Sequence, residues 1–308
     1  MADPSKDAAF WLIAMPLDGS RPLHQEQTFA ICGMSTHDAS SLENESYKIA
    51  MKAHIVLAHP EPKSFNAHLA NMAQQTLAER GWAVSSSDLY AMAFDPCEKA
   101  THYEDRLDIE RFDTQAEQRH ASKNETIPSE IQSEIARLDD ADLVILQYPM
   151  WWHLPPAILK GWFDRVMVYG EVYRSAYRFD KGRFVGKRAL LSLTVGTSPE
   201  TYAYNGRSGD IDLMLWPVNF TLAYVGFHIL QPHVAYGVEA GLRYSDPREV
   251  EERLQKIQSK YATRLQAIET ETPIPFNSMN DWGADGRIKA SAPAYSPFVR
   301  HREHLEID

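Results

Sequence analysis

Residues 51–70 read MKAHIVLAHPEPKSFNAHLA, and this stretch decides the fold class. Residues 55–58 form a short apolar run of the kind that a buried parallel strand requires. A polar turn follows at 59–63, and apolar residues then recur with a helical period from 64 to 80, where Gly81 predicts the helix end. A strand, a turn and a helix in this order are typical of the start of an α/β domain.

The alternation of strands and helices continues along the chain. Further strands are predicted at 82–84 with 88–90, at 142–148, at 188–194 and at 227–235. Helices are predicted from 128, at 155–169, at 211–224 and from the cap residue Asp246 to 268. Residues 94–126 are polar and weakly periodic, which favours a long excursion over the surface. Five strands that alternate with helices predict a doubly wound, five-stranded parallel sheet with helices on both faces.

The two ends of the chain differ from this central part. Residues 1–50 show no sustained period, so they are either a genuine extension or a stretch upstream of a translation start at Met51. Residues 271–308 are aperiodic and punctuated by prolines, but they carry aromatic side chains that must rest on the core or on a partner. The expected organisation is an N-terminal extension at 1–50, a catalytic domain at 51–270 and a C-terminal tail at 271–308.

Composition excludes several classes of function. The 308 residues include 31 Lys and Arg against 42 Asp and Glu, a net charge of −11, which argues against nucleic acid or an anionic membrane as partner. Cys32 and Cys97 are the only cysteines, too few for a disulfide scaffold or a Cys-rich zinc module, and they fit a reducing, cytoplasmic compartment. The histidines do not fall in metal-ligand spacings, so no metal is expected. No apolar run approaches the roughly 20 residues of a transmembrane helix.

Ligands of open parallel sheets bind at the carboxyl ends of the strands, so the loops after the first, third and fourth strands form the candidate site. After the first strand, Ser64, Phe65 and Asn66 stand at a helix start, where a hydroxyl, an amide and free backbone N–H groups suit a phosphate. A plain helix N-cap explains the same residues. The turn holds neither a Walker loop nor a GxGxxG motif, which argues against a nucleoside triphosphatase and a conventional dinucleotide-binding dehydrogenase.

The loop after the third strand, residues 147–155, reads QYPMWWHLP. Two adjacent tryptophans at a sheet end are costly to expose unless a flat ligand or a partner covers them, although core packing or a dimer contact is an alternative. His153 taken alone is explained as a satisfied polar residue, and within this loop it is a candidate substrate contact.

The loop after the fourth strand, residues 194–198, reads TVGTS and brings backbone donors and hydroxyl groups to the same edge. Gly196 permits the backbone to approach a ligand closely. A phosphate cradle, a flat aromatic wall and a donor-rich rim at one sheet edge together favour a flavin. Its phosphate would lie on the first loop and its ring system against the other two.

Seven short segments along residues 58–217 carry a resemblance to a known family. They are AHP at 58–60, SFN at 64–66, SDLYAM at 87–92, ADLV at 141–144, QYPMWW at 147–152, PAILKGWFDRV at 156–166 and LWP at 215–217. In this order they closely resemble the NAD(P)H:quinone oxidoreductase (DT-diaphorase) family, over roughly residues 52–275. The resemblance implies a flavodoxin-like fold, a homodimer with flavin sites at the subunit interface, bound FAD, and two-electron reduction of quinones by NADH or NADPH.

The resemblance also implies roles for individual residues. Those that would hold the diphosphate and ribityl side of the flavin are His59, Ser64, Phe65 and Asn66. Those that would line its isoalloxazine are Pro149, Met150, Trp151 and Trp152, with Thr194, Val195, Gly196 and Thr197 completing the rim. Tyr202 matches the active-site tyrosine at the flavin N1 and C2 carbonyl edge. Tyr173 and Tyr177 fall, with a one-residue length difference, where the family has tyrosines that cover the substrate pocket.

The sequence departs from the family pattern at Ser208 and Asp113. Ser208 stands where the family has its active-site histidine, and serine donates a hydrogen bond but cannot become cationic. Because negative charge develops near flavin N1 when hydride reaches N5, we hypothesise that Arg207 supplies the missing positive charge, against the alternative of a solvated surface arginine. Asp113 replaces a neutral amide near the adenine end, which leaves FMN open beside FAD.

The sequence therefore predicts a flavin-dependent NAD(P)H:quinone oxidoreductase that works by a ping-pong sequence. NAD(P)H passes hydride to flavin N5, leaves, and yields its place to a quinone, which an aromatic and weakly polar cavity selects by stacking. The alternatives are an FMN-dependent azo- or nitro-compound reductase and a regulatory flavoprotein associated with an ion-efflux system. We expect deletion of residues 1–50 to leave flavin content and quinone reduction intact.

Overall fold

The structure is a computed structural model that describes residues 50–239 and 246–301. Residues 1–49 of the predicted N-terminal extension and residues 302–308 of the predicted tail lie outside the described residues. No described helix is long and apolar enough to cross a membrane.

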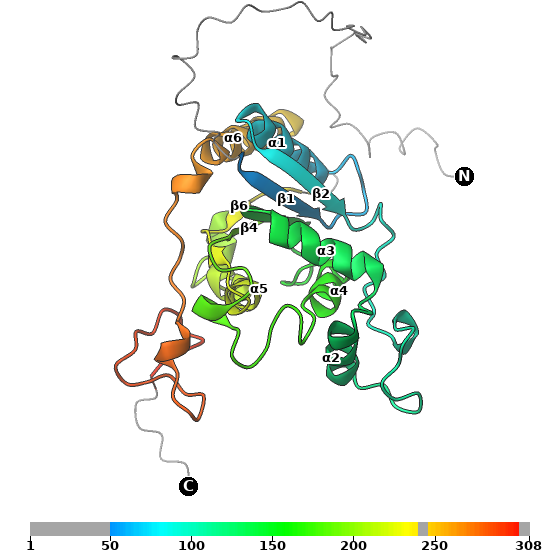
Figure 1. Cartoon of the computed structure of the whole chain (residues 1–308). Coiled ribbons are helices and arrows are strands. Elements are labelled where there is room, and N and C mark those ends of the chain that lie inside the picture. Colours follow the sequence, from blue (N-terminus) through cyan, green and yellow to red (C-terminus); the bar gives the residue numbers. More distant parts are fainter. Residues whose placement is uncertain (1–49, 240–245, 302–308) are drawn as a thin grey trace, which may run out of the picture. The chain divides into compact units, whose positions relative to one another are not determined.

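A parallel sheet forms the centre of the fold (Figure 1). Its strands are β1 (Lys52–Leu57), β2 (Ala83–Asp88), β3 (Leu143–Pro149), β4 (Arg188–Thr194), β5 (His228–Ile229) and β6 (His233–Ala235). Their spatial order is β2-β1-β3-β4-β5, and β6 also pairs with β4. Because the chain moves outward from β1 first to β2 and then, on the other side, to β3 and β4, the strand order reverses between β1 and β3.

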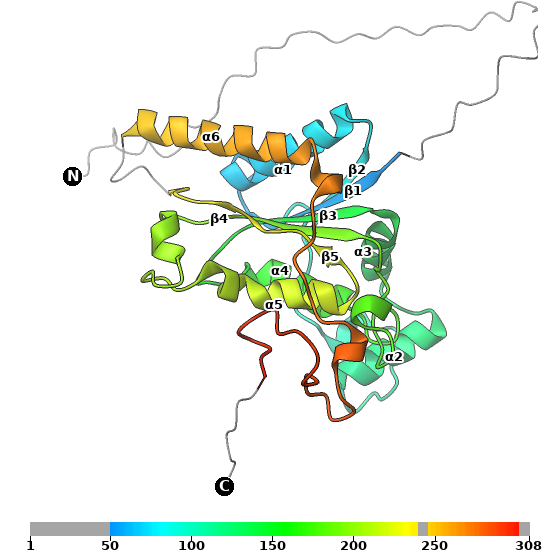
Figure 2. The same cartoon turned by 90° about the vertical axis from the view of Figure 1, so that its left-hand side faces the viewer.

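Helices cover both faces of this sheet, as the sequence predicts (Figure 2). On one face lie α1 (Phe65–Glu79) and α6 (Pro247–Leu265). On the other lie α3 (Ser129–Asp140), α4 (Ala157–Val166) and α5 (Ile211–Tyr224). The prediction of a doubly wound α/β fold is therefore confirmed.

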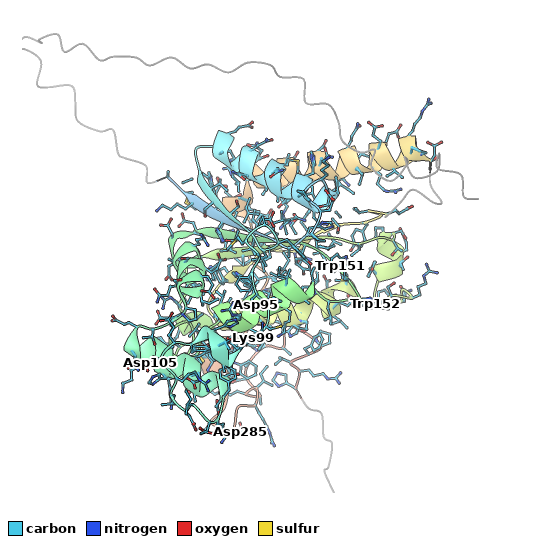
Figure 3. The ribbon with its side chains drawn as sticks, turned by 90° about the vertical axis from the view of Figure 1, so that its right-hand side faces the viewer. Asp95, Lys99, Asp105, Trp151, Trp152 and Asp285 are labelled. Atoms are coloured by element: carbon cyan, nitrogen blue, oxygen red, sulfur yellow. The ribbon has the colours of Figure 1, made fainter. Side chains whose placement is uncertain are left out.

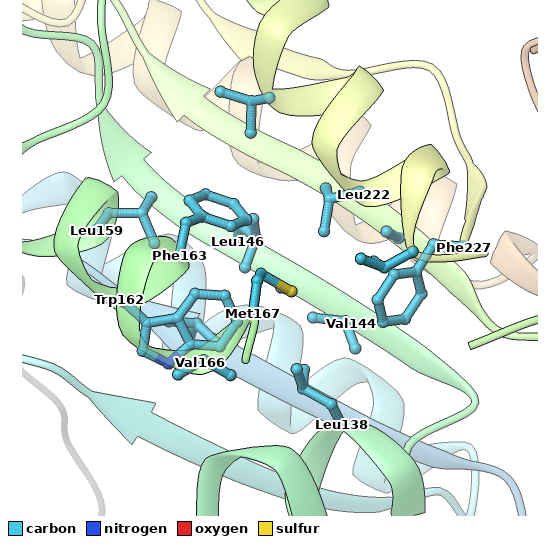
Figure 4. Packing of buried hydrophobic residues seen from close by; sticks show 14 of the residues in the cluster. Leu138, Val144, Leu146, Leu159, Trp162, Phe163, Val166, Met167, Leu222 and Phe227 are labelled. Carbon is cyan, nitrogen blue, oxygen red and sulfur yellow. The ribbon is translucent and has the colours of Figure 1, made fainter. Parts of the chain in front are cut away.

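The larger hydrophobic cluster lies between the sheet and α3, α4 and α5 (Figure 4). All seven residues of β3 are buried, as a central parallel strand requires. Trp162 of α4 is fully buried among them, and its indole Nε1 donates a hydrogen bond of 2.8 Å to the buried Glu134 carboxylate. Burial of one such side chain contributes about 3 kcal/mol to the free energy of unfolding. This rigid layer fixes the strand ends on which the loops depend.

Two elements differ from the sequence prediction. The strand predicted at 227–235 is divided into β5 and β6, because Pro232 has no N–H to donate to a ladder. Residues 94–126 contain the helix α2 (Thr114–Asn124), which was predicted as irregular surface chain. Asp113 caps this helix by accepting the Ala116 N–H at 3.1 Å. The sequence pattern does not predict this helix, because it is polar along nearly its whole length and has no apolar stripe.

Candidate active site

The carboxyl ends of β1, β3 and β4 bring three loops to one edge of the sheet. The Ala58 N–H, just after β1, donates to the Gln147 carbonyl of β3 at 2.9 Å. Pro149, at the end of β3, pairs in register with Thr194, at the end of β4. The strand order reverses at this place, which is where open α/β sheets bind their ligands.

Two local hydrogen bonds shape the loop after β1. The Oγ of Ser64 caps α1 by accepting the Ala67 N–H at 3.1 Å. The Nδ1 of His59 accepts the Glu61 N–H at 3.0 Å, so the neutral ring carries its proton on Nε2. Burial lowers the pKa of His59, which keeps this ring neutral at pH 7. The loop therefore offers an imidazole N–H donor near the positive end of a 15-residue helix.

Asn66 ties the first loop to the other two strands. Its Nδ2 donates to Thr194 Oγ1 at 2.9 Å, and its Oδ1 accepts from Gln147 Nε2, also at 2.9 Å. Asn66 is only 3% exposed, so its side chain serves mainly to hold β3, β4 and α1 together. The Oε1 of Gln147 is buried and has no hydrogen-bond partner among the described residues, which leaves one acceptor unsatisfied at the strand ends.

The loop after β3 contains a strained turn. Trp151 and Leu154 each accept the other's N–H at 3.0 Å, and the two residues between them, Trp152 and His153, have φ angles of 52° and 65°. Two consecutive left-handed residues make a type I′ turn, which normally takes Asn and Gly. Such conformations cost about 1–3 kcal/mol for each residue and cluster at ligand sites.

The same turn exposes two indole rings. Trp152 is 91% exposed and Trp151 42% exposed, and both lie well away from Asp285 in the C-terminal segment (Figure 3). The Trp151 ring also approaches the His59 ring of the first loop, with 6.2 Å between centroids. The strained turn therefore holds the exposed rings of Trp151 and Trp152 at the carboxyl ends of the strands, where they form an aromatic surface.

The loop after β4 is open toward the same edge. The Val195 N–H donates to the Ala235 carbonyl of β6 at 2.9 Å, which fixes the start of the loop. A Cβ atom added to Gly196 would meet only the Val238 carbonyl, at an ordinary 3.9 Å, so packing within the chain does not require glycine there. The Oγ1 of Thr197 is buried without a hydrogen-bond partner in the described part of the chain. A bare backbone and an unsatisfied hydroxyl are features that suit a bound ligand.

Tyr202 packs against Tyr236, a residue that the sequence reasoning missed. The two ring centroids are 6.2 Å apart with planes at 52°. Burial raises the pKa of Tyr236, and the Asp212 carboxylate at the start of α5 adds to this shift. Tyr236 directly follows β6 and lies outside the three loops that the sequence predicts for the site.

Ser208 and Arg207 lie in the turn that joins Tyr202 to α5. The Ser208 N–H donates to the Thr201 carbonyl at 3.0 Å, which folds this turn back on itself. Arg207 is exposed and makes no ion pair with any residue that the structure describes. In a single copy of the chain, the Arg207 guanidinium therefore lies in solvent.

Tyr173 and Tyr177 are not brought to this edge. They lie between the end of α4 and the start of β4, which places them at the amino ends of the strands. The Tyr173 ring contacts Tyr224, the last residue of α5, with centroids 5.9 Å apart, and Tyr177 is 56% exposed. One copy of the chain thus keeps Tyr177 and Trp152 at opposite edges of the sheet.

Comparison with known proteins agrees with this geometry. A family model described as a flavodoxin-like fold matches residues 51–263. NAD(P)H dehydrogenase (quinone) 1 of Cavia porcellus is 40% identical over 227 residues, which cover 73% of this chain and 80% of that protein. The chain belongs to the flavodoxin-like quinone dehydrogenase family.

Two further proteins are similar to most of the chain. Ribosyldihydronicotinamide dehydrogenase (quinone) of Homo sapiens is 39% identical over 228 residues, 73% of this chain and 94% of that protein. A crystal structure described as that of a quinone reductase from Klebsiella pneumoniae has a TM-score of 0.72 at 33% identity, covering 80% of this chain and 97% of that one. The flavodoxin-like family model ends at residue 263, before the C-terminal segment begins.

Among the described residues, no group of three or more His, Cys, Asp or Glu side chains is arranged to hold a metal ion. Asp113, which the family resemblance placed near an adenine, here caps α2.

Proposed function

We propose that this protein is an FAD-dependent NAD(P)H:quinone oxidoreductase that transfers two electrons in a ping-pong sequence. The observation that carries the proposal is the meeting, at one strand edge, of the α1 N-terminus, the strained tryptophan turn and the open Gly196 loop. Relatives named as quinone dehydrogenases, at 39–40% identity, support the same function. FAD is proposed over FMN on the family resemblance.

The diphosphate and ribityl side of the flavin would lie on the first loop. The backbone N–H groups at Phe65 and Asn66 begin α1, and the helix dipole favours negative charge there. The Ser64 hydroxyl already accepts the Ala67 N–H as the cap of α1. Ser64 would therefore contribute to flavin binding by fixing the conformation of the loop. The neutral His59 would add one N–H donor through Nε2. The helix N-terminus and the imidazole N–H suit a phosphate, and the neutral His59 ring adds no positive charge of its own.

The flat ring system would lie against the other two loops. Trp151 and Trp152 offer exposed aromatic surface and Met150 is half-buried beside them, whereas Pro149 is buried at the end of β3. Aromatic stacking selects flat molecules. Among the described residues, neither the buried Thr197 hydroxyl nor the buried side-chain Oε1 of Gln147 has a hydrogen-bond partner. Both fit the edge of a heterocycle that carries donors and acceptors, as an isoalloxazine does.

A bound flavin supplies the two-electron chemistry, and the chain's residues prepare its surroundings. Tyr202, with its ring held against Tyr236, would donate a hydrogen bond from its hydroxyl where negative charge develops. Ser208 can donate as well but cannot become cationic. Arg207, exposed beside it, would supply the positive charge when a ligand or a second copy excludes water from this turn. An unchanged hydride-transfer rate in Arg207→Ala would remove this role.

The pocket for the acceptor would be completed by a second copy of the chain. Tyr177 and Trp152 lie at opposite edges of one copy, and this separation supports a site in which the tyrosines that cover the substrate would come from a partner. We therefore propose a homodimer with its active sites at the interface, in which His153, Tyr173 and Tyr177 contact NAD(P)H or the quinone. The small number of cysteines fits a cytoplasmic location.

Mixed dimers test this arrangement. Trp152→Ala and Tyr177→Ala homodimers should each be impaired, whereas a heterodimer of the two variants has one intact site and should regain activity. Sedimentation velocity of the full chain should give a dimer.

The function itself is tested by identifying the flavin and by steady-state kinetics. The flavin released by denaturing the purified full-length protein should have the mass of FAD. Initial rates with NADPH and menadione varied together should give parallel double-reciprocal lines, as a ping-pong sequence requires. A protein that holds no flavin after reconstitution, or that is inert to NADH and NADPH, would contradict the proposal.

A further inference from the structure

The segment from Tyr169 to Lys181 carries both substrate tyrosines but has little secondary structure. It holds two isolated bridges, Tyr169 with Tyr173 and Arg174 with Tyr177, and the short helix η3 (Phe179–Lys181). No residue of this substrate segment pairs with the central sheet. Its backbone hydrogen bonds are short-range, such as Gly170 N–H to the Tyr173 carbonyl at 2.9 Å, so side-chain contacts hold the segment on the rest of the protein.

Phe179 is the strained point of the substrate segment. Its φ angle is 51°, in the left-handed region that a bulky aromatic residue rarely adopts. Such a conformation persists only where the surrounding packing determines it. The Phe179 ring is 8% exposed and contacts Phe220 and Tyr224 of α5, with centroids 5.7 Å and 5.3 Å away.

The third ring on Phe179 comes from the C-terminal tail. Trp282 stacks on it with centroids 5.9 Å apart and planes at 27°. The next residue of the substrate segment, Asp180, accepts the Met279 N–H through Oδ1 at 2.6 Å. The short helix η6 (Met279–Asp281) and Trp282 thus contact two consecutive residues of the segment.

The tail has anchors of its own on α5 and the sheet. The Ile274 N–H donates to the Ile229 carbonyl of β5 at 2.8 Å. The rings of Phe276 and Phe298 both stack on Trp216 of α5, with centroids 4.9 Å and 6.0 Å away. Figure 2 shows the tail crossing from α6 to the outer side of α5. Because these contacts do not involve Trp282, the tail can remain in place when that ring is removed.

A chain of rings connects the tail to the substrate tyrosines. Trp282 contacts Phe179, Phe179 contacts Tyr224, and Tyr224 contacts Tyr173. We propose that Trp282 is a positioning residue, which holds the segment from Tyr169 to Lys181 in the conformation that contacts the acceptor. In the dimer, the tail of one copy would then control acceptor binding in the site of its partner. This inference rests on the proposed function for its link to the acceptor.

Trp282→Ala in the full-length, FAD-loaded protein tests the proposal with two independent readings. The first is tryptic cleavage after Arg174 and Arg178, which should become faster because the substrate segment opens more often. The second is steady-state kinetics, in which the quinone KM should rise roughly tenfold as the tyrosines lose their position, while the rate of flavin reduction at saturating NADPH and the flavin content stay unchanged.

Matched variants separate positioning from general loss of packing. Trp282→Phe keeps a stacked ring and should restore both readings. Tyr295→Ala removes an exposed aromatic side chain from the same tail, without a ring contact in the described residues, and should change neither. Asp180→Ala removes the hydrogen bond to the Met279 N–H, keeps the Trp282 ring, and should change both readings in the same direction but less. If Trp282→Ala destabilises the whole chain, Asp180→Ala still carries the test.

The outcomes distinguish this inference from the proposed function. Unchanged cleavage after Arg174 and Arg178 in Trp282→Ala and Asp180→Ala would overturn the positioning role, whether or not the protein reduces quinones. Faster cleavage with an unchanged quinone KM would overturn the link to acceptor binding. A wild-type protein without quinone reductase activity would contradict the proposed function, while the cleavage reading would still decide whether Trp282 holds the segment.

Discussion

The side chain of Asn66 donates a 2.9 Å hydrogen bond to Thr194, a residue 128 positions later in the chain. This bond joins the first turn of α1 to the end of β4, across the intervening β3. The family resemblance assigns Asn66 to flavin binding. The same residue also joins two of the three site loops through this hydrogen bond. The geometry of the site depends on this buried amide.

Asn66→Ala should lower both stability and flavin content. The substitution leaves the Gln147 amide and the Thr194 hydroxyl buried without their partner, which costs about 2–3 kcal/mol in the free energy of unfolding. Asn71→Ala, at an exposed position of the same helix, is the matched control and should cost less than about 0.5 kcal/mol. Urea denaturation measures both variants, and equal losses would show that the buried amide has no special part.

The free energy of unfolding should fall as the pH is lowered from 6.5 to about 4, and His54 contributes to this fall. Its Nδ1 lies 2.9 Å from Ser85 Oγ and its Nε2 3.2 Å from Ser87 Oγ, and burial lowers its pKa from 6.5 to about 4. The unfolded chain therefore binds the proton more readily than the folded chain. The stabilising effect is complete above pH 6.5 and is lost as pH falls toward 4, by at most about 1.4 kcal/mol per pH unit.

His54→Gln should reduce this pH dependence, because glutamine binds no proton in the unfolded chain. Urea denaturation at several pH values measures the slope. His68→Gln, at an exposed position of α1, should leave the slope unchanged. A slope that is the same in His54→Gln and in the wild type would assign the pH dependence to other groups.

His153→Gly should stabilise the protein while weakening acceptor binding. Glycine adopts the φ of 65° without strain, so the free energy of unfolding should rise by about 1 kcal/mol. His153→Val should do the opposite, because a β-branched residue resists positive φ. Thermal denaturation ranks the three proteins, and a destabilised His153→Gly would mean that the imidazole makes contacts worth more than the strain. The quinone KM of His153→Gly should rise.

Gly161→Ala should be destabilising despite its place in a helix interior. A Cβ atom at Gly161 would lie 2.2 Å from the Pro96 carbonyl oxygen, so α4 would have to move away from the 94–97 backbone. Overpacking of this kind costs about 1–3 kcal/mol, although alanine is the better helix former. Lys160→Ala, at the exposed neighbouring position, is the control. A Gly161→Ala protein as stable as wild type would show that the helix relaxes freely.

Local pattern was enough to predict most of the fold. The helix at 211–224 and the strand at 188–194 were predicted with the bounds that the structure has, since each is a continuous apolar or periodic run between clear breaks. The helix α2 was missed because tertiary contacts hold it, among them the Gln118 bond to the Asp164 carbonyl at 3.3 Å. Such contacts leave no period in the sequence.

The candidate site was predictable in its loops but less so in its details. The topology rule indicated the loops after the first, third and fourth predicted strands, and the structure brings the ends of β1, β3 and β4 to one edge. Tyr236 was missed because it approaches Tyr202 from a short, divided edge strand. The spacing of residues in the sequence could not predict that the Asn66 side chain hydrogen-bonds Gln147 and Thr194, because such contacts depend on strand register.

We propose that these three loops hold a flavin that passes electrons from NAD(P)H to a quinone. Single-turnover, anaerobic mixing of the FAD-loaded full-length protein with NADPH or NADH tests it most directly. The nucleotide should bleach the absorbance of the bound flavin in one phase, and one equivalent of menadione should then restore it. A bound flavin that neither nucleotide reduces, or that menadione does not reoxidise, would contradict this function.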